Sequence, residues 1–197
     1  ADLIRQLRLK FAMKDLGPTR HILGMKISRH RDKQQLFLSQ TDYIERVLER
    51  FNLLLTKSTS TLLPINLQLS QRGCPTSSPK GETMKLRLGS LMYAMVTTWL
   101  DIAHTVGVVS RFIHNLGRSN WNVIKLVFIY LVGTRYIGIL FGPKKNPSVV
   151  GYTGSNFASC VDSLKSTTGY LFKFSKGAIL CKSKFQGFTT TSTTEAE

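Results

Sequence analysis

The N-terminal part of the chain changes from helical to strand periodicity and back again. Residues 3–12 carry apolar side chains at helical spacing, and a Gly-Pro pair follows them, as is typical of a helix end. The stretch HILGMKISRHRDKQQLFLSQ predicts a β-hairpin around a polar turn, with Gly24 in its first arm. DYIERVLERFNL returns to helical spacing, and Ser39 or Thr41 is placed to cap this helix. Its predicted apolar stripe consists of Tyr43, Ile44, Val47, Leu48 and Phe51.

A stretch without periodicity leads from there to a helical region. Residues 55–84 are rich in Ser, Thr and Pro, which is typical of a linker. Asp101 and Asn120 are placed to cap two of the helices that follow. The predicted helices cover residues 86–99, 101–115 and 120–132. In the last of them the spacing of Trp121 and Phe128 favours core packing over base stacking.

From residue 136 onward the pattern becomes that of strands. The segments YIGILFG, VVGYTGSNF, GYLFKF and AILCKSKF predict an antiparallel β-meander, and TTTSTTEAE predicts a capped helix start. The element order predicts the α+β class, with a β-hairpin and a helical region before the meander and a boundary near residue 137.

Charge is the strongest compositional signal. The chain of 197 residues has 27 Lys plus Arg against 11 Asp plus Glu, a formal net charge of +16. This excess suits a polyanionic partner, because cations that bind phosphates release condensed counterions. Loss of surface acids by drift would give the same excess without creating a binding site. Composition leaves both interpretations open.

Cysteine and histidine usage argues against two classes of site. The three cysteines include no CxxC pair, and the four histidines are scattered, so neither a disulfide framework nor a zinc site is predicted. We expect an intracellular, reducing setting, with cytoplasm and nucleus not distinguished. Asp101 and His104 interrupt the longest apolar run, so we expect a buried helix pair there and no membrane span.

Several motifs together carry a family resemblance. MKDLGPTRHILGMKISR, LSQTDYIERVLERFN, GSLMYAMV, DIAHTVGVVSRF, STTGYLFKFSKGAI and STTEAE resemble, in order and spacing, segments of copia-type LTR retrotransposon Pol polyproteins of the plant type. The resemblance covers essentially the whole chain. It implies that residues 1–54 are the end of a reverse transcriptase palm with a primer-grip-like hairpin and the first thumb helix. It further implies a linker at 55–84, a helical thumb or connection region at 85–135, and the N-terminal part of a ribonuclease H-like domain at 138–197.

The same resemblance points to missing catalytic acids. The polymerase chemistry of the family needs a Tyr-x-Asp-Asp motif, and this sequence contains no adjacent Asp pair. The family's nuclease strand resembles GYTDADWAG, so Gly154 and Asn156 occupy the places of two aspartates, and Glu197 matches one helix carboxylate. Because two Mg²⁺ ions need clustered carboxylates, we expect an incomplete metal site and no cofactor bound by this chain alone. Mg²⁺ is the cofactor that the resemblance implies for the parent family.

Candidate nucleic-acid contacts are of two kinds. By resemblance, Gly24 and Met25 lie in a hairpin that steadies a primer end, and Lys26 and Arg29 are candidate phosphate contacts. Gly24 marking a bulge, with solvated cations around it, is the structural alternative. Arg46 and Arg50 are four residues apart on one predicted helix face, where pairing with Glu45 and Glu49 is the alternative. Lys182 and Lys184 share one face of a predicted strand and are weaker candidates.

These features predict a fragment of a retrotransposon reverse transcriptase and ribonuclease H polyprotein that is catalytically inactive by itself. Its expected partners are RNA–DNA hybrids or other nucleic acids, bound without sequence preference, and the remainder of the polyprotein. Two alternatives stay open: a piece of a composite polymerase or nuclease completed by another chain, and a decayed relic without function.

Overall fold

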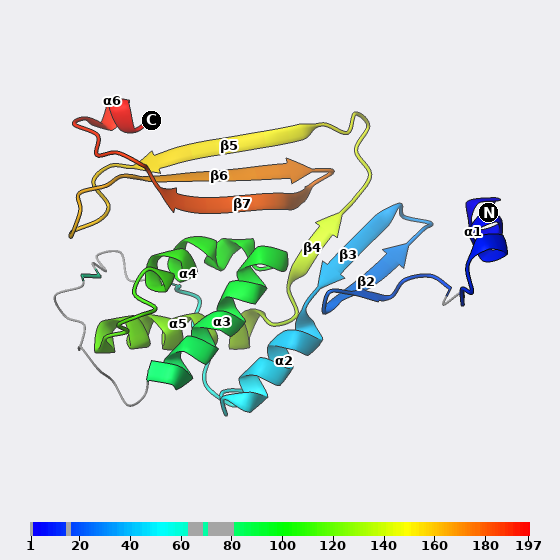
Figure 1. The fold of residues 1–197 in the computed structure, drawn as a ribbon, viewed down its shortest axis with the longest axis horizontal. Helices are drawn as coiled ribbons and strands as arrows, with labels where there is room; N and C mark the ends of the chain where they lie inside the picture. The colour runs from blue at the N-terminus through cyan, green and yellow to red at the C-terminus, as the bar shows by residue number, and fades with distance from the viewer. Residues whose placement is uncertain (1, 15–16, 63–68, 71–80) are drawn as a thin grey trace.

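Two antiparallel sheets and a group of helices make up the body of the protein in the computed structural model (Figure 1). The structure describes residues 2–14, 17–62, 69–70 and 81–197. Most of the predicted linker at 55–84 and Cys74 lie outside the described residues, while Cys160 and Cys181 are free thiols. The predicted α+β class with antiparallel strands is confirmed.

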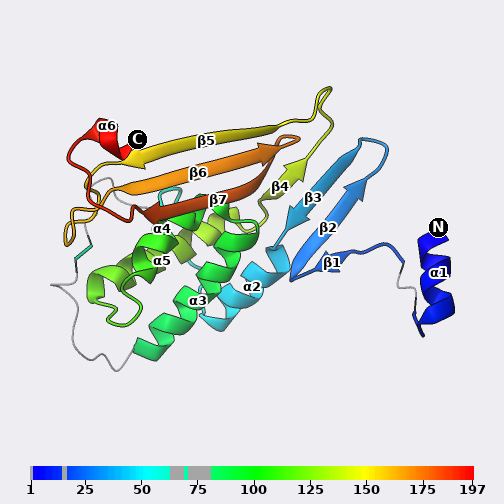
Figure 2. The same ribbon diagram turned by 45° about the horizontal axis from the view of Figure 1, so that its top comes forward.

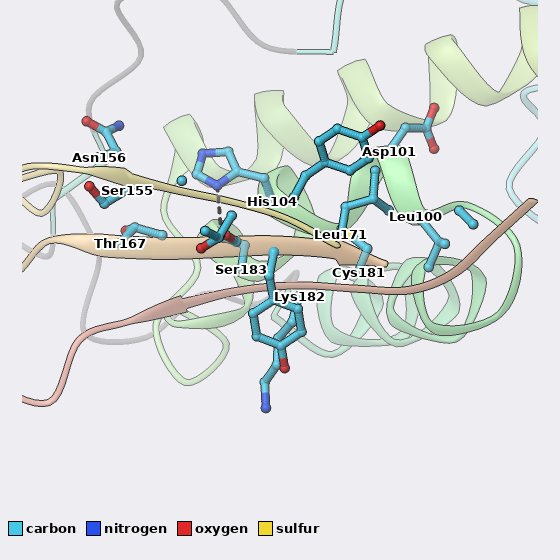
Figure 3. Close-up of a pocket in the computed structure, with 16 residues that line it drawn as sticks. Leu100, Asp101, His104, Ser155, Asn156, Thr167, Leu171, Cys181, Lys182 and Ser183 are labelled. Atoms are coloured by element: carbon cyan, nitrogen blue, oxygen red, sulfur yellow. Dashed lines mark hydrogen bonds between the residues drawn. The ribbon is translucent and has the colours of Figure 1, made fainter. Parts of the chain in front are cut away.

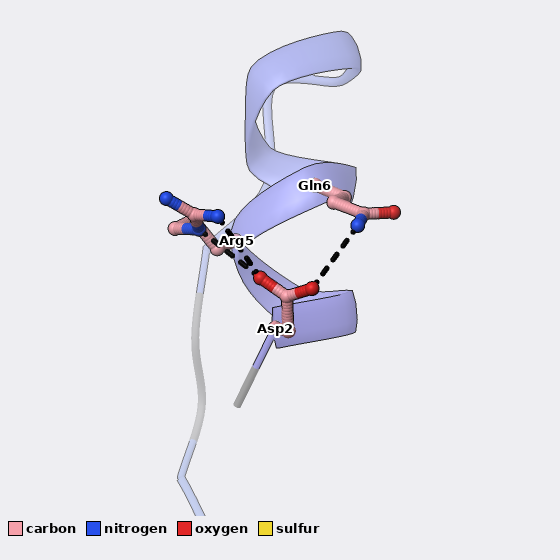
Figure 4. A network of polar contacts seen from close by, with 3 residues as sticks. All are labelled: Asp2, Arg5 and Gln6. Atoms are coloured by element: carbon pink, nitrogen blue, oxygen red, sulfur yellow. Dashed lines mark hydrogen bonds and ion pairs between the residues drawn. The ribbon is translucent and has the colours of Figure 1, made fainter.

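The N-terminal helix α1 (Asp2–Lys10) lies apart from this body in both ribbon views (Figures 1 and 2). Its first turn is held by side chains, since Asp2 accepts hydrogen bonds from Arg5 at 3.0 Å and from Gln6 at 3.2 Å (Figure 4). Leu3 and Phe11 of its predicted apolar stripe are exposed. Helical spacing in this segment therefore gives a helix, but the described residues do not cover that stripe.

The first sheet has the order β1-β2-β3-β4. Its strands are β1 (His21–Ile22), β2 (Met25–His30), β3 (Gln35–Ser39) and β4 (Gly138–Phe141). The predicted first arm of the hairpin is itself folded, because a tight turn at Leu23 and Gly24 pairs β1 with β2. The expectation that the segment YIGILFG opens the C-terminal meander is wrong, since Leu36–Ser39 pair with Gly138–Phe141. Side-chain periodicity identifies a strand but not its partner.

Helices pack together beneath the second sheet. They are α2 (Thr41–Arg50), α3 (Gly81–Thr97), the 3₁₀ turn η2 (Leu100–Ile102), α4 (Ala103–Ser110) and α5 (Arg118–Thr134). The core at their centre includes Ile44, Leu48, Leu88, Leu91, Ile102, Val106, Ile124, Phe128 and Leu131. The predicted stripe of the helix after the hairpin faces this core, with Tyr43 and Phe51 partly buried beside it. Trp121 and Phe128 pack in or against the core, as their spacing predicted.

The predicted helix caps agree less well with the structure than the predicted apolar stripes do. Gln40, not Ser39 or Thr41, precedes α2, and its side chain makes no capping bond to the described residues. Asn120 is buried inside α5, which begins after Gly117, and Asp101 lies in η2, where it accepts from the amide of Ile102. Capping residues were misassigned because helix ends depend on tertiary packing as well as on local residue type.

The second sheet has the order β5-β6-β7 and is followed by a short helix. Its elements are β5 (Val149–Asn156), β6 (Thr167–Phe174), β7 (Gly177–Phe185) and α6 (Thr193–Ala196). Ser192 caps α6 by accepting from the amide of Glu195, as the pattern TTTSTTEAE predicted. Figures 1 and 2 both show this sheet above α4 and α3. None of the described helices is long and apolar enough to cross a membrane.

Candidate nucleic-acid interface

The turn of the hairpin is fixed by a contact from the helical region. Leu23 and Gly24 have φ values of 47° and 67°, a conformation that only glycine adopts without strain. The Tyr93 hydroxyl donates a hydrogen bond to the Leu23 carbonyl, and a Cβ at Gly24 would lie 3.0 Å from that hydroxyl. Tyr93 also meets the Tyr43 ring edge-on, with centroids 4.8 Å apart. Gly24 is therefore required by a tight turn packed against α3.

Basic side chains line the outer edge of this hairpin. Lys26 and Arg29 are exposed and Met25 is half-buried. Because side chains alternate along a strand, Lys26 and Arg29 project to opposite faces of β2. Arg29 donates to the Thr19 carbonyl at 3.1 Å, which ties the preceding segment to the strand. A cavity of about 710 Å³ at this edge is lined by Arg20, His21, Lys26, Arg29, His30 and Arg31, among others.

The two arginines of α2 are exposed on one helix face. The alternative in which Glu45 and Glu49 neutralise them is not what the described residues show. Glu45 instead pairs with Arg135, the residue that follows α5, with 3.8 Å between Oε1 and Nε. Arg46 donates to the Asp42 carbonyl at 3.1 Å, and neither Arg46 nor Arg50 forms an ion pair within the described part of the chain. This helix face therefore keeps its positive charge.

Helix α2 and the hairpin also contact each other through polar side chains. His21 Nε2 of β1 lies 3.9 Å from Asp42 Oδ2 of α2. The basic edge of the hairpin and the basic face of α2 are thus parts of neighbouring elements. The strands β2 and β3 separate these two residues in the sequence, yet the residues come together here, and a polyanion lying along this side would meet both sets of cations.

The strand that resembles a nuclease strand has no acid at its tip. Gly154 pairs with Gly169, which pairs with Ser183, so these three residues share one face of the second sheet. No atom of the described residues lies within 4 Å of a Cβ built at Gly154. Asn156 pairs with Thr167 on the same face. The place predicted for two carboxylates is therefore open and uncharged.

Helix α4 faces this side of the sheet across an open cavity of about 680 Å³ (Figure 3). The His104 Nδ1 atom lies 3.0 Å from the Ser183 hydroxyl oxygen. Burial, and secondarily the neighbouring Arg111, lower the pKa of His104. Asp101 at the rim is already engaged, since the Tyr130 hydroxyl donates to it at 2.5 Å. Burial and this hydrogen bond raise the pKa of Tyr130 to about 12.

The remaining predicted ligand lies at the end of α6. Glu197 follows Ala196 there, while Glu195 accepts from the amide and hydroxyl of Thr191, the residue before the N-cap Ser192. Over the described ranges, no three His, Cys, Asp or Glu side chains come together as a possible metal site. Lys182 and Lys184 are exposed, and the strand alternation places them on the face opposite Ser183.

The sequence analysis did not predict two of the side-chain contacts in the structure. The His104–Ser183 contact joins residues 79 positions apart, and no local pattern could have indicated it. Arg87 of α3 lies between the rings of Phe51 and Trp121. Helical spacing had marked both rings as core residues, but it could not place a guanidinium between them.

Several known proteins are similar to this chain over all or nearly all of its length. A Retrovirus-related Pol polyprotein from transposon TNT 1-94 of Nicotiana tabacum is 50% identical over 100% of this chain. An uncharacterized mitochondrial protein of Arabidopsis thaliana is 32% identical over 99% of this chain and 79% of its own length. The chain belongs to the copia-type Pol polyproteins of plant retrotransposons. This Pol segment is also 30% identical to the Retrovirus-related Pol polyprotein from transposon RE2 of Arabidopsis thaliana, over 97% of its residues.

The copia-type Pol segment is a small part of such polyproteins. It spans 15% of the tobacco polyprotein and 13% of the RE2 polyprotein. No family model matches the segment. No solved structure matches it either. Family membership therefore comes from whole-chain identity to these named relatives.

Proposed function

We propose that this Pol segment binds nucleic-acid duplexes, RNA–DNA hybrids above all, through sequence-independent phosphate contacts. The observation that carries the proposal is the unpaired positive charge on two adjoining elements. Lys26 and Arg29 lie along the hairpin edge, and Arg46 and Arg50 lie on α2 without an ion pair to the described residues. Contacts from Lys and Arg to phosphates give affinity without reading bases.

The finer assignment of modules belongs to the same proposal. Residues 1–54 correspond to the end of a reverse transcriptase palm, a primer-grip-like hairpin and the first thumb helix, and residues 85–135 to a thumb or connection region. The antiparallel order β5-β6-β7 followed by α6 supports a ribonuclease H-like beginning. Because β4 pairs with β3, we place the start of this unit at β5 rather than at residue 138.

The nuclease-like unit is proposed to be inactive in this chain. Hydrolysis by two metal ions requires carboxylates that hold the ions about 3.5–4 Å apart. Gly154 and Asn156 supply none, and Glu197 alone cannot balance two divalent cations. Mg²⁺ thus belongs to the chemistry of the parent family, and this segment would contribute binding of the nucleic acid.

A salt series tests the proposal. Binding of a labelled mixed-sequence RNA–DNA hybrid should weaken linearly in log K against log salt concentration. The double variants K26Q/R29Q and R46Q/R50Q should each bind roughly tenfold more weakly. Each should also reduce the magnitude of the slope of log K against log salt by about two, since each removes two phosphate contacts. The matched control K145Q removes one exposed lysine that lies on neither basic element, and it should leave the slope unchanged.

Affinity that does not depend on salt, or equal effects of K145Q and the double variants, would refute the proposal. Urea unfolding of every variant shows whether each one folds. If a variant unfolds with the wild-type midpoint yet binds more weakly, its loss of affinity comes from lost contacts rather than from a folding defect.

A further inference from the structure

A guanidinium group is held between two aromatic rings at the side of the helical region. The Arg87 Cζ atom lies 4.6 Å from the centroid of the Phe51 ring and 4.7 Å from the Trp121 ring. The three residues come from α3, the end of α2 and the start of α5. Stacking on two rings fixes the plane of a side chain that otherwise has many rotamers.

Two further cations complete a cluster, here called the Arg87 cluster, of Arg50, Phe51, Arg87, Trp121 and Lys125. Arg50 Cζ lies 5.9 Å from the Phe51 centroid, and Lys125 Nζ lies 5.9 Å from the Trp121 centroid. No acidic residue occurs in α5. Within the described residues, none of the three cations forms an ion pair.

The polar edge of Arg87 is short of acceptors. Its Nε atom is buried without a hydrogen-bond partner among the described residues. Burial lowers the pKa of Arg87 from its ordinary value. A guanidinium group in a protein is effectively always charged, so the cluster presents a fork of donors that forms no ion pair with the described residues.

We propose that the Arg87 cluster binds a phosphate of a nucleic-acid backbone, as a contact separate from the hairpin edge. The planar fork of Arg87 matches two oxygens of one phosphate, and Arg50 and Lys125 flank it to meet neighbouring phosphates. Trp121 is half-buried, which leaves part of its ring available to a sugar or base. The proposal rests on the proposed function only in requiring that the chain binds nucleic acid.

The phosphate backbone fits this cluster better than an acidic peptide does. Carboxylates of a peptide are separated by flexible side chains, whereas a nucleic acid presents phosphates at regular intervals beside stackable bases. The chain's net charge of +16 favours the partner with the higher charge density. Polyglutamate is therefore the competitor that distinguishes an acidic peptide from a nucleic-acid backbone as the ligand.

The test compares R87Q and R87K in binding to the labelled RNA–DNA hybrid over a salt series. R87Q should bind roughly tenfold more weakly and reduce the magnitude of the slope of log K against log salt by about one. R87K keeps the charge but loses the planar fork, so it should keep the slope and bind roughly threefold more weakly. K145Q is the matched control, and K26Q/R29Q reports separately on the hairpin edge.

Several results would overturn the proposal. The proposal is overturned if R87Q binds with full affinity, or if it binds more weakly with an unchanged salt slope. In either case K26Q/R29Q still tests the proposed function separately. Competition by polyglutamate as strong as by unlabelled hybrid would overturn the choice of ligand. Binding of free nucleoside triphosphate that R87Q abolishes, with hybrid binding unaffected, would overturn the assignment to the backbone. If R87Q does not fold, the loss of affinity in R87K relative to K145Q carries the test.

Discussion

The His104 imidazole of α4 and the Ser183 hydroxyl of β7 lie 3.0 Å apart, and this contact helps attach the second sheet to the helical region. Arg111 adds a second contact nearby, with its Cζ atom 3.3 Å from the centroid of the Phe185 ring. Ser183 and Phe185 point to the same face of β7, as residues two positions apart in a strand do. The two contacts therefore hold one face of that strand against α4.

The first prediction concerns pH. Burial and Arg111 lower the pKa of folded His104 below its ordinary value of 6.5. The unfolded state thus binds more protons near and below pH 6.5, so the free energy of unfolding should fall as pH falls from 6.5 toward the lowered pKa. The stabilisation that comes from the neutral His104 should be fully present above pH 6.5. Urea titrations across that range measure it.

The variant H104Q should lose that dependence, because glutamine keeps a polar partner for Ser183 but does not titrate. H114Q removes an exposed histidine, and it should retain the wild-type pH dependence. Identical pH profiles for H104Q and the wild type would contradict the assignment.

A second prediction concerns two glycines in strands. A Cβ at Gly138 would lie 2.3 Å from the Leu38 carbonyl oxygen and 2.7 Å from the Phe37 ring. G138A should therefore lower the free energy of unfolding by about 1–3 kcal/mol. At Gly154 no described atom lies within 4 Å, so G154A should change it by less than about 0.5 kcal/mol. Urea unfolding measures the change in the free energy of unfolding for both variants. Equal changes in G138A and G154A would show that the β3–β4 pairing is wrong.

The third prediction concerns the tie between the hairpin turn and α3. Y93F removes the hydroxyl that donates to the Leu23 carbonyl but keeps the ring against Tyr43. We expect a loss of about 1 kcal/mol in stability and faster amide hydrogen exchange in β1 and β2. Y136F is the control, since Tyr136 is 64% exposed. Unchanged exchange in Y93F would mean that the turn holds its shape without α3.

The fourth prediction concerns the nuclease-like strand. G154D alone should not give hybrid cleavage in Mg²⁺ or Mn²⁺, because one added carboxylate and Glu197 cannot neutralise two bound ions. The rate should equal that of the protein treated with a chelator. Cleavage that requires metal and disappears in G154D/E197Q would contradict the inactive assignment.

Strand and helix periodicity predicted most of the elements, because each element buries one face and that face repeats along the chain. The stripe of α2 and the spacing in α5 correctly assigned Ile44, Val47, Leu48 and Phe128 to the core. The same reasoning failed for β4, since alternation is equally compatible with either sheet. It also failed for Glu45, whose nearest cation in sequence is Arg46 but whose partner in space is Arg135.

The sequence by itself determined the family, the positive charge and the missing acids at Gly154 and Asn156, because these depend on residue identity at fixed positions. Only the tertiary structure decided which strands pair, that His104 meets Ser183, and that Arg87 lies between Phe51 and Trp121. Such contacts depend on how separate elements pack around a shared core. Local periodicity specifies the face that each element buries, but not the neighbour that covers it.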